Sequence, residues 1–198
     1  GIALHEIIQN GKHQNLDLLL SNIQDLLAEQ RINKIAADYY HISQWLEQNA
    51  SSNYEFIIID APASTSPISI NAMLAADLII VPLECEALAI KSLKRFLQAF
   101  KELQKNIEPG LRLAGILLTM YDDEILSHQQ VCRQIYQTLG DSVFETIIPN
   151  CPYILEASSM GIDVIQRHLN SEGATGYIRL ANELLDRFLL PKSEGEIK

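Results

Sequence analysis

The sequence predicts an α/β fold, a mostly parallel sheet flanked by helices on both faces. Apolar runs of strand length alternate with longer amphipathic segments along most of the 198 residues. Strands that alternate with helices in this way are joined by crossovers, which make neighbouring strands parallel. We expect residues 1–190 to form a single α/β domain and residues 191–198 to form a flexible tail.

The first third of the chain is predicted to hold two strands with helical structure between them. Residues 15–20 form a short apolar run after a turn, and residues 21–48 place apolar side chains at helical spacing, as one bent helix or two short ones. Residues 54–59 are the clearest strand, because they end in Phe-Ile-Ile-Ile. A run that is apolar on both faces is typical of a buried parallel strand.

The remaining residues continue the alternation of strands and helices. Further strands are predicted at residues 78–82, 112–119 and 144–149. Helices are predicted at residues 66–76, 87–106, 127–139 and 174–190. Gly140 is expected to end the third of these helices, because glycine is common just past a helix C-terminus.

Charge and composition exclude several classes of protein. There are 15 basic and 25 acidic residues, a formal net charge of −10, which argues against a general polyanion binder. No apolar run is long enough to cross a bilayer, and no signal peptide pattern is present, so we expect a cytoplasmic protein. Cys85, Cys132 and Cys151 lack the spacing of a zinc site or a redox pair and are expected to be buried thiols.

The carboxyl ends of the predicted strands are the expected place for a ligand. In open parallel sheets ligands bind beyond these ends, so the segments at Asp60, 82–86, 119–123 and 149–152 should line one crevice. A carboxylate that follows a buried strand, as Asp60 does, is typical of enzymes that hold the water shell of Mg²⁺. The alternative for Asp60 is a loop residue that caps neighbouring amides.

A phosphate-binding loop should accompany such a carboxylate, but neither G-x-x-x-x-G-K-[ST] nor G-x-G-x-x-G occurs. Without backbone amides and a lysine on the phosphates, this chain alone should not hydrolyse a nucleotide. A flavodoxin-like redox domain is also disfavoured, since no phosphate-binding loop follows the first strand.

The ordered segments over residues 15–185 resemble the ParA/Soj family of P-loop ATPases, relatives of MinD that partition chromosomes and plasmids. Residues 54–60 with Pro62 are similar to the family's YDYIIIDCPP, and residues 81–89 are similar to PVQCEYYAL. Further similar segments are 15–18, 21–23, 70–72, 115–122, 146–149, 156–161 and 173–174. The resemblance implies a P-loop NTPase-like fold and an ATPase that dimerises with ATP.

The resemblance also implies roles for single residues. Asp60 is similar to the switch carboxylate that holds Mg²⁺ through water, and Pro62 belongs to the same switch loop. Glu86 resembles the residue that reaches the partner's nucleotide across an ATP-bound homodimer. The loops that wall the nucleotide base are similar to those at Met120, Pro149 and Asn150.

The chain departs from the family pattern at its beginning. The family's lysine-bearing P-loop precedes the first matching segment, so we expect a chain that is truncated at the N-terminus and inactive alone. The alternative function is a non-catalytic ParA-like interaction scaffold. If the family function holds, the implied ligands and partners are ATP, Mg²⁺, a second copy of the chain and a ParB-like adaptor.

DNA and membrane binding are both disfavoured. Glu124 aligns with an arginine that the family uses on DNA, and residues 150–153 lack a second such arginine, so no DNA-binding residue is assigned and nucleoid association would require another contact. The basic face of residues 87–106 is interpreted as solvated. The last helix is expected to dock on the core rather than on a membrane, because its flanking charges are mixed.

Overall fold

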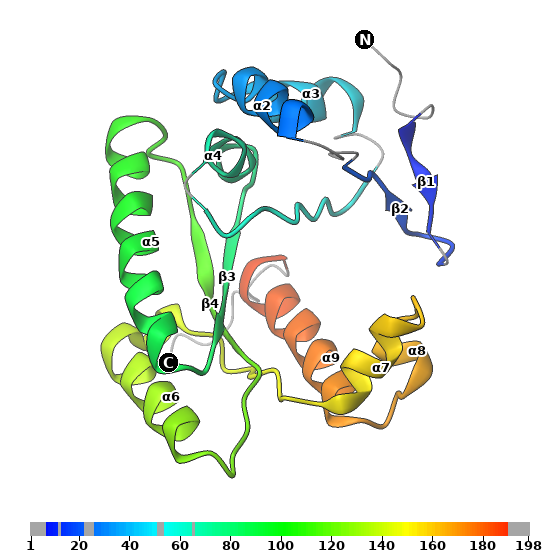
Figure 1. Ribbon diagram of the computed structural model, residues 1–198, viewed down its shortest axis with the longest axis vertical. Helices are drawn as coiled ribbons and strands as arrows, with labels where there is room; N and C mark the ends of the chain where they lie inside the picture. The colour runs from blue at the N-terminus through cyan, green and yellow to red at the C-terminus, as the bar shows by residue number, and fades with distance from the viewer. Residues whose placement is uncertain (1–6, 12, 22–25, 51–53, 65, 190–198) are drawn as a thin grey trace, which may run out of the picture. The chain divides into compact units, whose positions relative to one another are not determined.

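The computed structural model describes residues 7–11, 13–21, 26–50, 54–64 and 66–189, which pack as two units (Figure 1). The N-terminal unit comprises residues 1–78 and 101–112, and the C-terminal unit comprises residues 79–100 and 113–198. Each unit is a group of residues that pack against one another, and this grouping does not test whether the chain is one domain. The single domain expected over residues 1–190 therefore stays a prediction. The expected flexible tail, 191–198, lies outside the described residues.

Two parallel strands form the centre of the C-terminal unit. β3 (Ile79–Glu84) pairs parallel with β4 (Leu113–Thr119), with a register shift between Ile79 and Ile80 and with Pro82 opposite Leu117. Five consecutive residues of β4, 114–118, are buried, as expected for a strand covered on both faces. The strands predicted at 78–82 and 112–119 and their parallel direction are therefore confirmed.

A third extended segment follows β4 in the same direction. Val143 forms a parallel bridge with Ile116, and the Phe144 N–H donates to the Ile116 carbonyl at 2.9 Å. The Ile148 N–H donates to the Leu118 carbonyl at 2.9 Å. The segment predicted as the strand 144–149 thus lies where expected, with bridges near its ends rather than a continuous ladder.

Gly115 allows this close approach. A Cβ atom at residue 115 would lie 3.0 Å from the Phe144 ring and 3.1 Å from the Ser142 carbonyl oxygen. Such contacts are tighter than ordinary packing, so a side chain at this position would push the third segment away from β4.

Helices cover the strands of the C-terminal unit on two sides. Figure 1 shows α5 (Ala87–Asn106) and α6 (Leu126–Leu139) on one side of β3 and β4, and α7 (Pro152–Ser159), α8 (Val164–Arg167) and α9 (Glu172–Leu184) on the other. The helices predicted at 87–106 and 127–139 are confirmed, and Gly140 follows the second with a φ of 50°. The last predicted helix begins at Glu172 and continues beyond α9 as a π-helical turn, Leu185–Leu189. α7 and α8 were not predicted.

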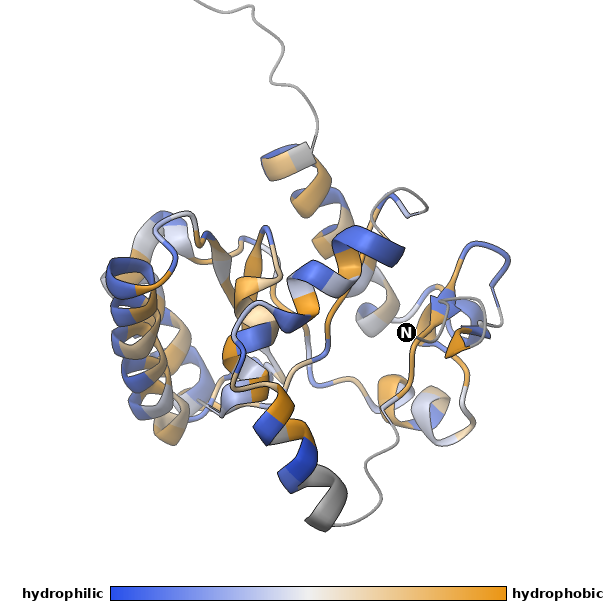
Figure 2. Ribbon diagram, turned by 90° about the horizontal axis from the view of Figure 1, so that it is seen from above, coloured by the Kyte–Doolittle hydropathy of each residue, from blue (hydrophilic) through white to orange (hydrophobic). Residues whose placement is uncertain are grey.

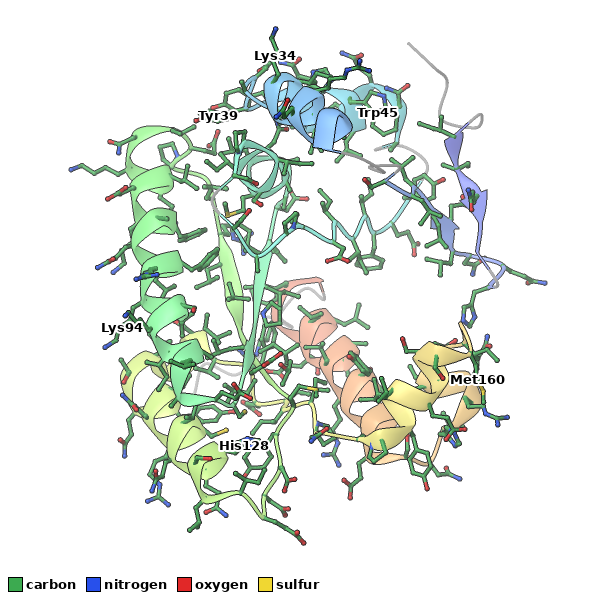
Figure 3. The ribbon with its side chains drawn as sticks, viewed as in Figure 1. Lys34, Tyr39, Trp45, Lys94, His128 and Met160 are labelled. Atoms are coloured by element: carbon green, nitrogen blue, oxygen red, sulfur yellow. The ribbon has the colours of Figure 1, made fainter. Side chains whose placement is uncertain are left out.

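The main core of the C-terminal unit lies between the strands and the pair α5 and α6. Its buried members are Leu83, Cys85, Leu93, Ile116, Leu118, Val131, Cys132, Ile135 and Val143. Figure 2 shows β3 and β4 as mainly hydrophobic, whereas α5 carries both kinds of residue. Figure 3 shows Lys94 on the side of α5 away from the strands. The basic residues of α5 are all exposed, as predicted: Lys91, Lys94, Arg95, Lys101 and Lys105.

The described part of the N-terminal unit contains three whole helices and a small hairpin, together with residues 54–64 and the end of α5 from Lys101 onward. The helices are α2 (Leu26–Ile35), α3 (His41–Asn49) and α4 (Pro67–Leu74). Of the two alternatives for residues 21–48, two short helices is correct. α4 confirms the helix predicted at 66–76, and Pro67 stands at its first position, where a missing N–H costs nothing.

Asn71 ties these helices together from a fully buried position. Its side-chain carbonyl accepts the Ile42 N–H at 2.8 Å, and its amide nitrogen donates to the carbonyls of Ala36 and Asp38. A buried amide is stable only when its polar atoms find partners, and here both ends do. α4 is therefore linked to the turn between α2 and α3.

The strand predicted at residues 15–20 is largely wrong. Only Asp17–Leu18 (β2) is a strand, and it pairs antiparallel with Gln9–Asn10 (β1). Leu16, Leu19 and Leu20 are exposed. An apolar run becomes a buried parallel strand only when neighbouring strands accept its backbone hydrogen bonds, and β2 has one two-residue neighbour among the described residues.

The buried strand predicted at residues 54–59 is also wrong. The segment is extended but unpaired within the described part of the chain, and Ile58 is 93% exposed. Within the described residues it is anchored by the Tyr54 hydroxyl, which donates to the Asp17 carboxylate at 2.7 Å. β-propensity reflects fit to a half-buried sheet surface, so the same residues stay extended without forming a ladder where that surface is missing.

Within the described residues, none of the helices combines the length and the apolar character needed to span a membrane.

Candidate functional site

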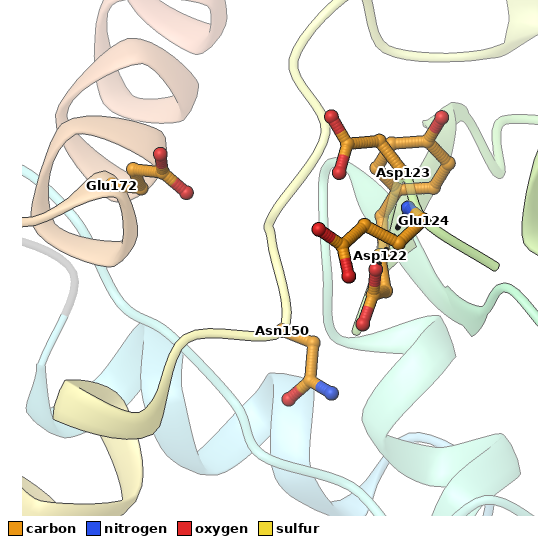
Figure 4. A pocket seen from close by; sticks show the side chains of 6 residues that line it. Asp122, Asp123, Glu124, Asn150 and Glu172 are labelled. Atoms are coloured by element: carbon orange, nitrogen blue, oxygen red, sulfur yellow. Dashed lines mark hydrogen bonds between the residues drawn. The ribbon is translucent and has the colours of Figure 1, made fainter.

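An open pocket of about 310 Å³ lies beyond the carboxyl end of β4 in the C-terminal unit (Figure 4). It is lined by Tyr121, Asp122, Asp123, Glu124, Asn150 and Glu172. Figure 4 shows the three consecutive acidic residues on one side and Glu172, from α9, on the other. Of the four segments that were expected to line one crevice, 119–123 and 149–152 contribute to this pocket, whereas Asp60 and residues 82–86 are not among its lining residues.

Met120 turns the chain from β4 into this pocket. Among the described non-glycine residues it alone has a positive φ, 54°. A side chain in this left-handed region costs roughly 1–2 kcal/mol, so surrounding contacts must hold it there. They do: the Tyr121 N–H donates to the Ile148 carbonyl at 3.2 Å, and the Asn150 N–H donates to the Tyr121 carbonyl at 2.7 Å.

The acidic turn after Tyr121 is held by its own hydrogen bonds. Asp122 accepts the Glu124 N–H at 2.9 Å through its carboxylate, and the Asp122 N–H donates to His128 Nδ1 at 3.1 Å. The Gln129 side chain donates to the Asp123 carbonyl at 2.6 Å. His128 and Gln129 both belong to α6. This helix therefore fixes the position of the turn that carries the exposed carboxylates of Asp123 and Glu124.

The pocket is negative and rich in hydrogen-bond acceptors. Burial, and then the nearby Cys132 and Asp123, raise the pKa of Tyr121, so its hydroxyl stays protonated and uncharged at neutral pH. Glu172 stands in the first turn of α9, where the helix dipole favours an anion. This surface would repel phosphate groups and suits groups that donate hydrogen bonds, such as the amino edge of a base.

No metal centre of several ligands is formed by the described residues. They contain no group of three or more His, Cys, Asp or Glu side chains that could hold an ion. Any Mg²⁺ site among these residues would therefore use one or two carboxylates together with water and phosphate oxygens, which is a common arrangement for this ion.

Three of the residues expected to wall a base are brought together. Pro149 forms a parallel bridge with Tyr121, directly after Met120, and Asn150 lines the pocket. Glu86 is exposed at the carboxyl end of β3, one residue before α5. All four residues predicted to contact a nucleotide here lie at the same edge of the parallel strands: Glu86, Met120, Pro149 and Asn150. Their roles stay predictions.

Asp60 and Pro62 belong to the N-terminal unit and are both exposed. They are not among the residues that line the pocket. The Pro62 carbonyl accepts the Ser64 N–H at 2.7 Å and the Ser69 hydroxyl at 3.0 Å, so the loop after Asp60 is anchored to α4. The Mg²⁺ role of Asp60 stays a prediction.

Sequence reasoning missed two residues of the pocket, Glu124 and Glu172, whereas Tyr121, Asp122, Asp123 and Asn150 lie within the predicted segments. Glu124 directly follows the segment 119–123 and could have been included. Glu172 lies 48 residues beyond Glu124 along the chain, two residues before the helix predicted at 174–190, and no local signal connects the two.

Comparison with known proteins gives a family and close relatives. A family described as an AAA domain matches residues 2–113. The chromosome-partitioning ATPase Soj of Thermus thermophilus is 40% identical over 134 residues, which are 68% of this chain and 54% of that protein. The sporulation initiation inhibitor protein Soj of Bacillus subtilis is 32% identical over 179 residues, which are 90% of this chain and 70% of that protein.

A solved structure supports the fold. Cobyrinic acid a,c-diamide synthase from Mycobacterium smegmatis, with bound ADP and magnesium, matches with a TM-score of 0.73 and 25% identity over 93% of this chain and 67% of that chain. The predicted α/β class is thus confirmed. The chain spans about half to two thirds of the length of the first curated relatives that it matches.

Proposed function

Because this chain belongs to the ParA/Soj family of ATPases, which are MinD-like, we propose that it serves chromosome or plasmid partitioning as part of an ATP-dependent switch. In this proposal ATP and Mg²⁺ bind at the carboxyl edge of the sheet, and binding drives association of two copies. A ParB-like adaptor is the proposed partner. The observation that supports the proposal is the meeting of Met120, Pro149 and Asn150 beside a pocket at that edge.

The residues at the pocket fit the base end of a nucleotide. The exposed Met120 side chain and the Pro149 ring offer apolar surface to the face of a base, and the Asn150 amide can both donate to and accept from its edge. The neighbouring carboxylates accept hydrogen bonds from an exocyclic amino group. These properties support a purine that carries an amino group, as adenine does.

The phosphate end does not fit these 198 residues. No G-x-x-x-x-G-K-[ST] pattern is present, and the described pocket is lined by four carboxylates, which would repel a triphosphate. We therefore propose that hydrolysis requires a phosphate-binding loop that these residues do not supply, and that the chain is inactive alone. Asp60 would hold Mg²⁺ through water, Pro62 would shape its loop, and Glu86 would reach the nucleotide of the partner subunit.

A non-catalytic interaction scaffold is the second candidate function. The missing phosphate-binding pattern and the acidic pocket favour it, since neither suits a nucleotide phosphate. Both candidates keep the same sheet and differ in whether a nucleotide binds.

Nucleotide titration separates the two candidates. Fluorescent ATP would be titrated, with and without Mg²⁺, into the 198-residue chain and into the longest natural protein that contains it, while light scattering follows the mass. The switch predicts binding and dimerisation by the longer protein and loss of binding on Asn150→Ala, with exposed Glu102→Gln as the control. Absence of binding by the longer protein would establish the scaffold. Binding that keeps its Mg²⁺ dependence after Asp60→Ala would reject the role of Asp60.

The proposal places the protein in the cytoplasm. It also excludes non-specific DNA binding through the two positions at which the family carries arginines, Glu124 and Tyr153 in this chain. Glu124 lines the acidic pocket, and Tyr153, at the start of α7, is 47% exposed. An acidic and a neutral side chain at these positions would not hold phosphate groups.

A further inference from the structure

Three serine hydroxyls form a hydrogen-bonded cluster where the loop after Asp60 meets α4. Ser64 Oγ lies 2.9 Å from Ser66 Oγ and 2.9 Å from Ser69 Oγ, and the last two atoms are 3.2 Å apart. Ser64 is exposed, Ser66 is half-buried, and Ser69 is only 2% exposed. The cluster therefore runs from the solvent to the inside of the N-terminal unit.

The protons of the cluster point in one direction. Ser69 Oγ donates to the Pro62 carbonyl at 3.0 Å, so its single proton is used there. Ser64 donates to Ser66. With its own proton on the Pro62 carbonyl, Ser69 is an acceptor for Ser64 at 2.9 Å and for Ser66 at 3.2 Å, so the cluster leads from these two hydroxyls through Ser69 to the Pro62 oxygen. Hydrogen bonds in such chains polarise and strengthen one another.

The carbonyl that Ser69 holds belongs to Pro62, a residue whose backbone torsion φ is fixed. The proline ring holds φ of Pro62 near −65°, so fixing its carbonyl also constrains the peptide that precedes it. Residues 60–63 are exposed and lie outside helices and strands. The Ser69 hydroxyl and the Ser64 N–H both donate to the Pro62 carbonyl and thus anchor the loop two residues after Asp60.

We propose that Ser69 is a positioning residue for the Asp60 loop, whose hydroxyl holds the Pro62 carbonyl so that the Asp60 carboxylate is presented to the water shell of Mg²⁺. The inference rests on the proposed function. Ser69→Ala leaves the Pro62 carbonyl with one donor and removes the acceptor of Ser66. The Pro62 carbonyl then loses its hydrogen bond to α4, and part of the Mg²⁺ affinity is spent on ordering this part of the loop again.

The test measures the Mg²⁺ concentration that half-saturates ATP binding in the longest natural protein containing this chain. Ser69→Ala should raise it by about three- to tenfold, the effect of one hydrogen bond. Ser69→Thr, which keeps the hydroxyl, should restore it to within about twofold. ATP affinity without Mg²⁺ should not change. Exposed Ser92→Ala on α5 is the matched control. If Ser69→Ala does not fold, Ser66→Ala interrupts the same chain at a half-buried position and should raise the Mg²⁺ requirement.

Hydrogen exchange of the Ser64 amide separates the possible outcomes, because this N–H donates to the same carbonyl. Faster exchange in Ser69→Ala with an unchanged Mg²⁺ requirement would overturn the positioning role, provided that Asp60→Ala does raise that requirement. A requirement that Asp60→Ala also leaves unchanged would instead reject the proposed Mg²⁺ site itself. Failure of Ser69→Thr to restore Mg²⁺ binding would assign the effect to packing and overturn the inference.

Discussion

The sulfur atoms of Cys85 and Cys132 lie 3.4 Å apart in the core of the C-terminal unit, although 47 residues separate them in sequence. Cys85 directly follows β3, and Cys132 lies on α6. Cys85 is fully buried and Cys132 is 7% exposed. The contact therefore joins the sheet edge that carries the pocket to the helix that anchors its acidic turn.

The thiols should differ in reactivity. Burial, and then the hydrogen bond with Cys132, raise the pKa of Cys85 to about 12, so little thiolate forms at neutral pH. We expect iodoacetamide to modify half-buried Cys151 at least about tenfold faster than Cys85 under native conditions. Mass spectrometry of peptides would measure the rates, and denatured protein, in which all three should react alike, is the control. Equal native rates for Cys85 and Cys151 would contradict the burial.

Glu183 should make stability depend on acid. Burial alone would raise its pKa, but the hydrogen bonds from Thr146, the backbone N–H of Glu145 and the charge of Arg187 outweigh burial, and its pKa is lowered. Its two carboxylate oxygens accept the N–H groups of Glu145 and Thr146 at 2.7 and 2.8 Å. A lowered pKa stabilises the fold above the pKa of the unfolded chain, and this contribution is lost as the pH falls through the folded pKa.

We therefore expect Glu183→Gln to lower the free energy of unfolding by about 1–3 kcal/mol at neutral pH. The difference from the wild type should shrink as the solution is acidified below the ordinary glutamate range. Urea unfolding at several pH values measures it, with exposed Glu102→Gln as the control. A difference that grew in acid would have the wrong sign for this mechanism.

Met120 should tolerate glycine better than a β-branched residue. Its φ of 54° suits glycine and strains isoleucine. We expect Met120→Ile to lower the free energy of unfolding by about 1–2 kcal/mol and Met120→Gly to leave it unchanged or raise it. Met160, which is also exposed but has a φ of −92°, is the matched control, and there glycine should not be favoured. The opposite order at residue 120 would exclude the left-handed conformation.

Charge reversal should create DNA affinity. Replacing Glu124 and Tyr153 with arginine removes one anion and adds two cations at the positions where the family carries arginines. We expect tighter binding of non-specific duplex DNA at low salt, with a salt slope steeper by about one for each new phosphate contact. Fluorescence anisotropy at several salt concentrations measures this, with Asp141→Arg, an exposed site in the same unit, as the control. An equal gain from the control would show that only net charge matters.

Periodicity placed the elements of the C-terminal unit well. The bounds of α5 agree with those predicted, β3 begins one residue and ends two residues later than predicted, and β4 begins one residue later and ends as predicted. Their signals are strong because each element buries one face or both, which imposes a regular pattern on its residues. α7 and α8 are short, and α8 has four residues, too few for a pattern to emerge.

The N-terminal unit shows the limit of that signal. Residues 54–59 have the composition of a buried strand, yet Phe56 and Ile58 are exposed. Composition records what a segment can do when partners surround it, and whether partners are present is a property of distant residues. The strand predicted at residues 15–20 is reduced to β2, which pairs with β1 through two residues.

By itself the sequence determined the alternation of helices and strands, the family resemblance and the acidic character of the chain, because these depend on the order of residues alone. Only the tertiary structure decided that Tyr121 and Glu172 share a pocket, that Met120 takes a left-handed conformation, and that Ser69 holds the Pro62 carbonyl. Such relationships join residues that pack or hydrogen-bond across turns and between elements, and side-chain periodicity within one element carries no information about them.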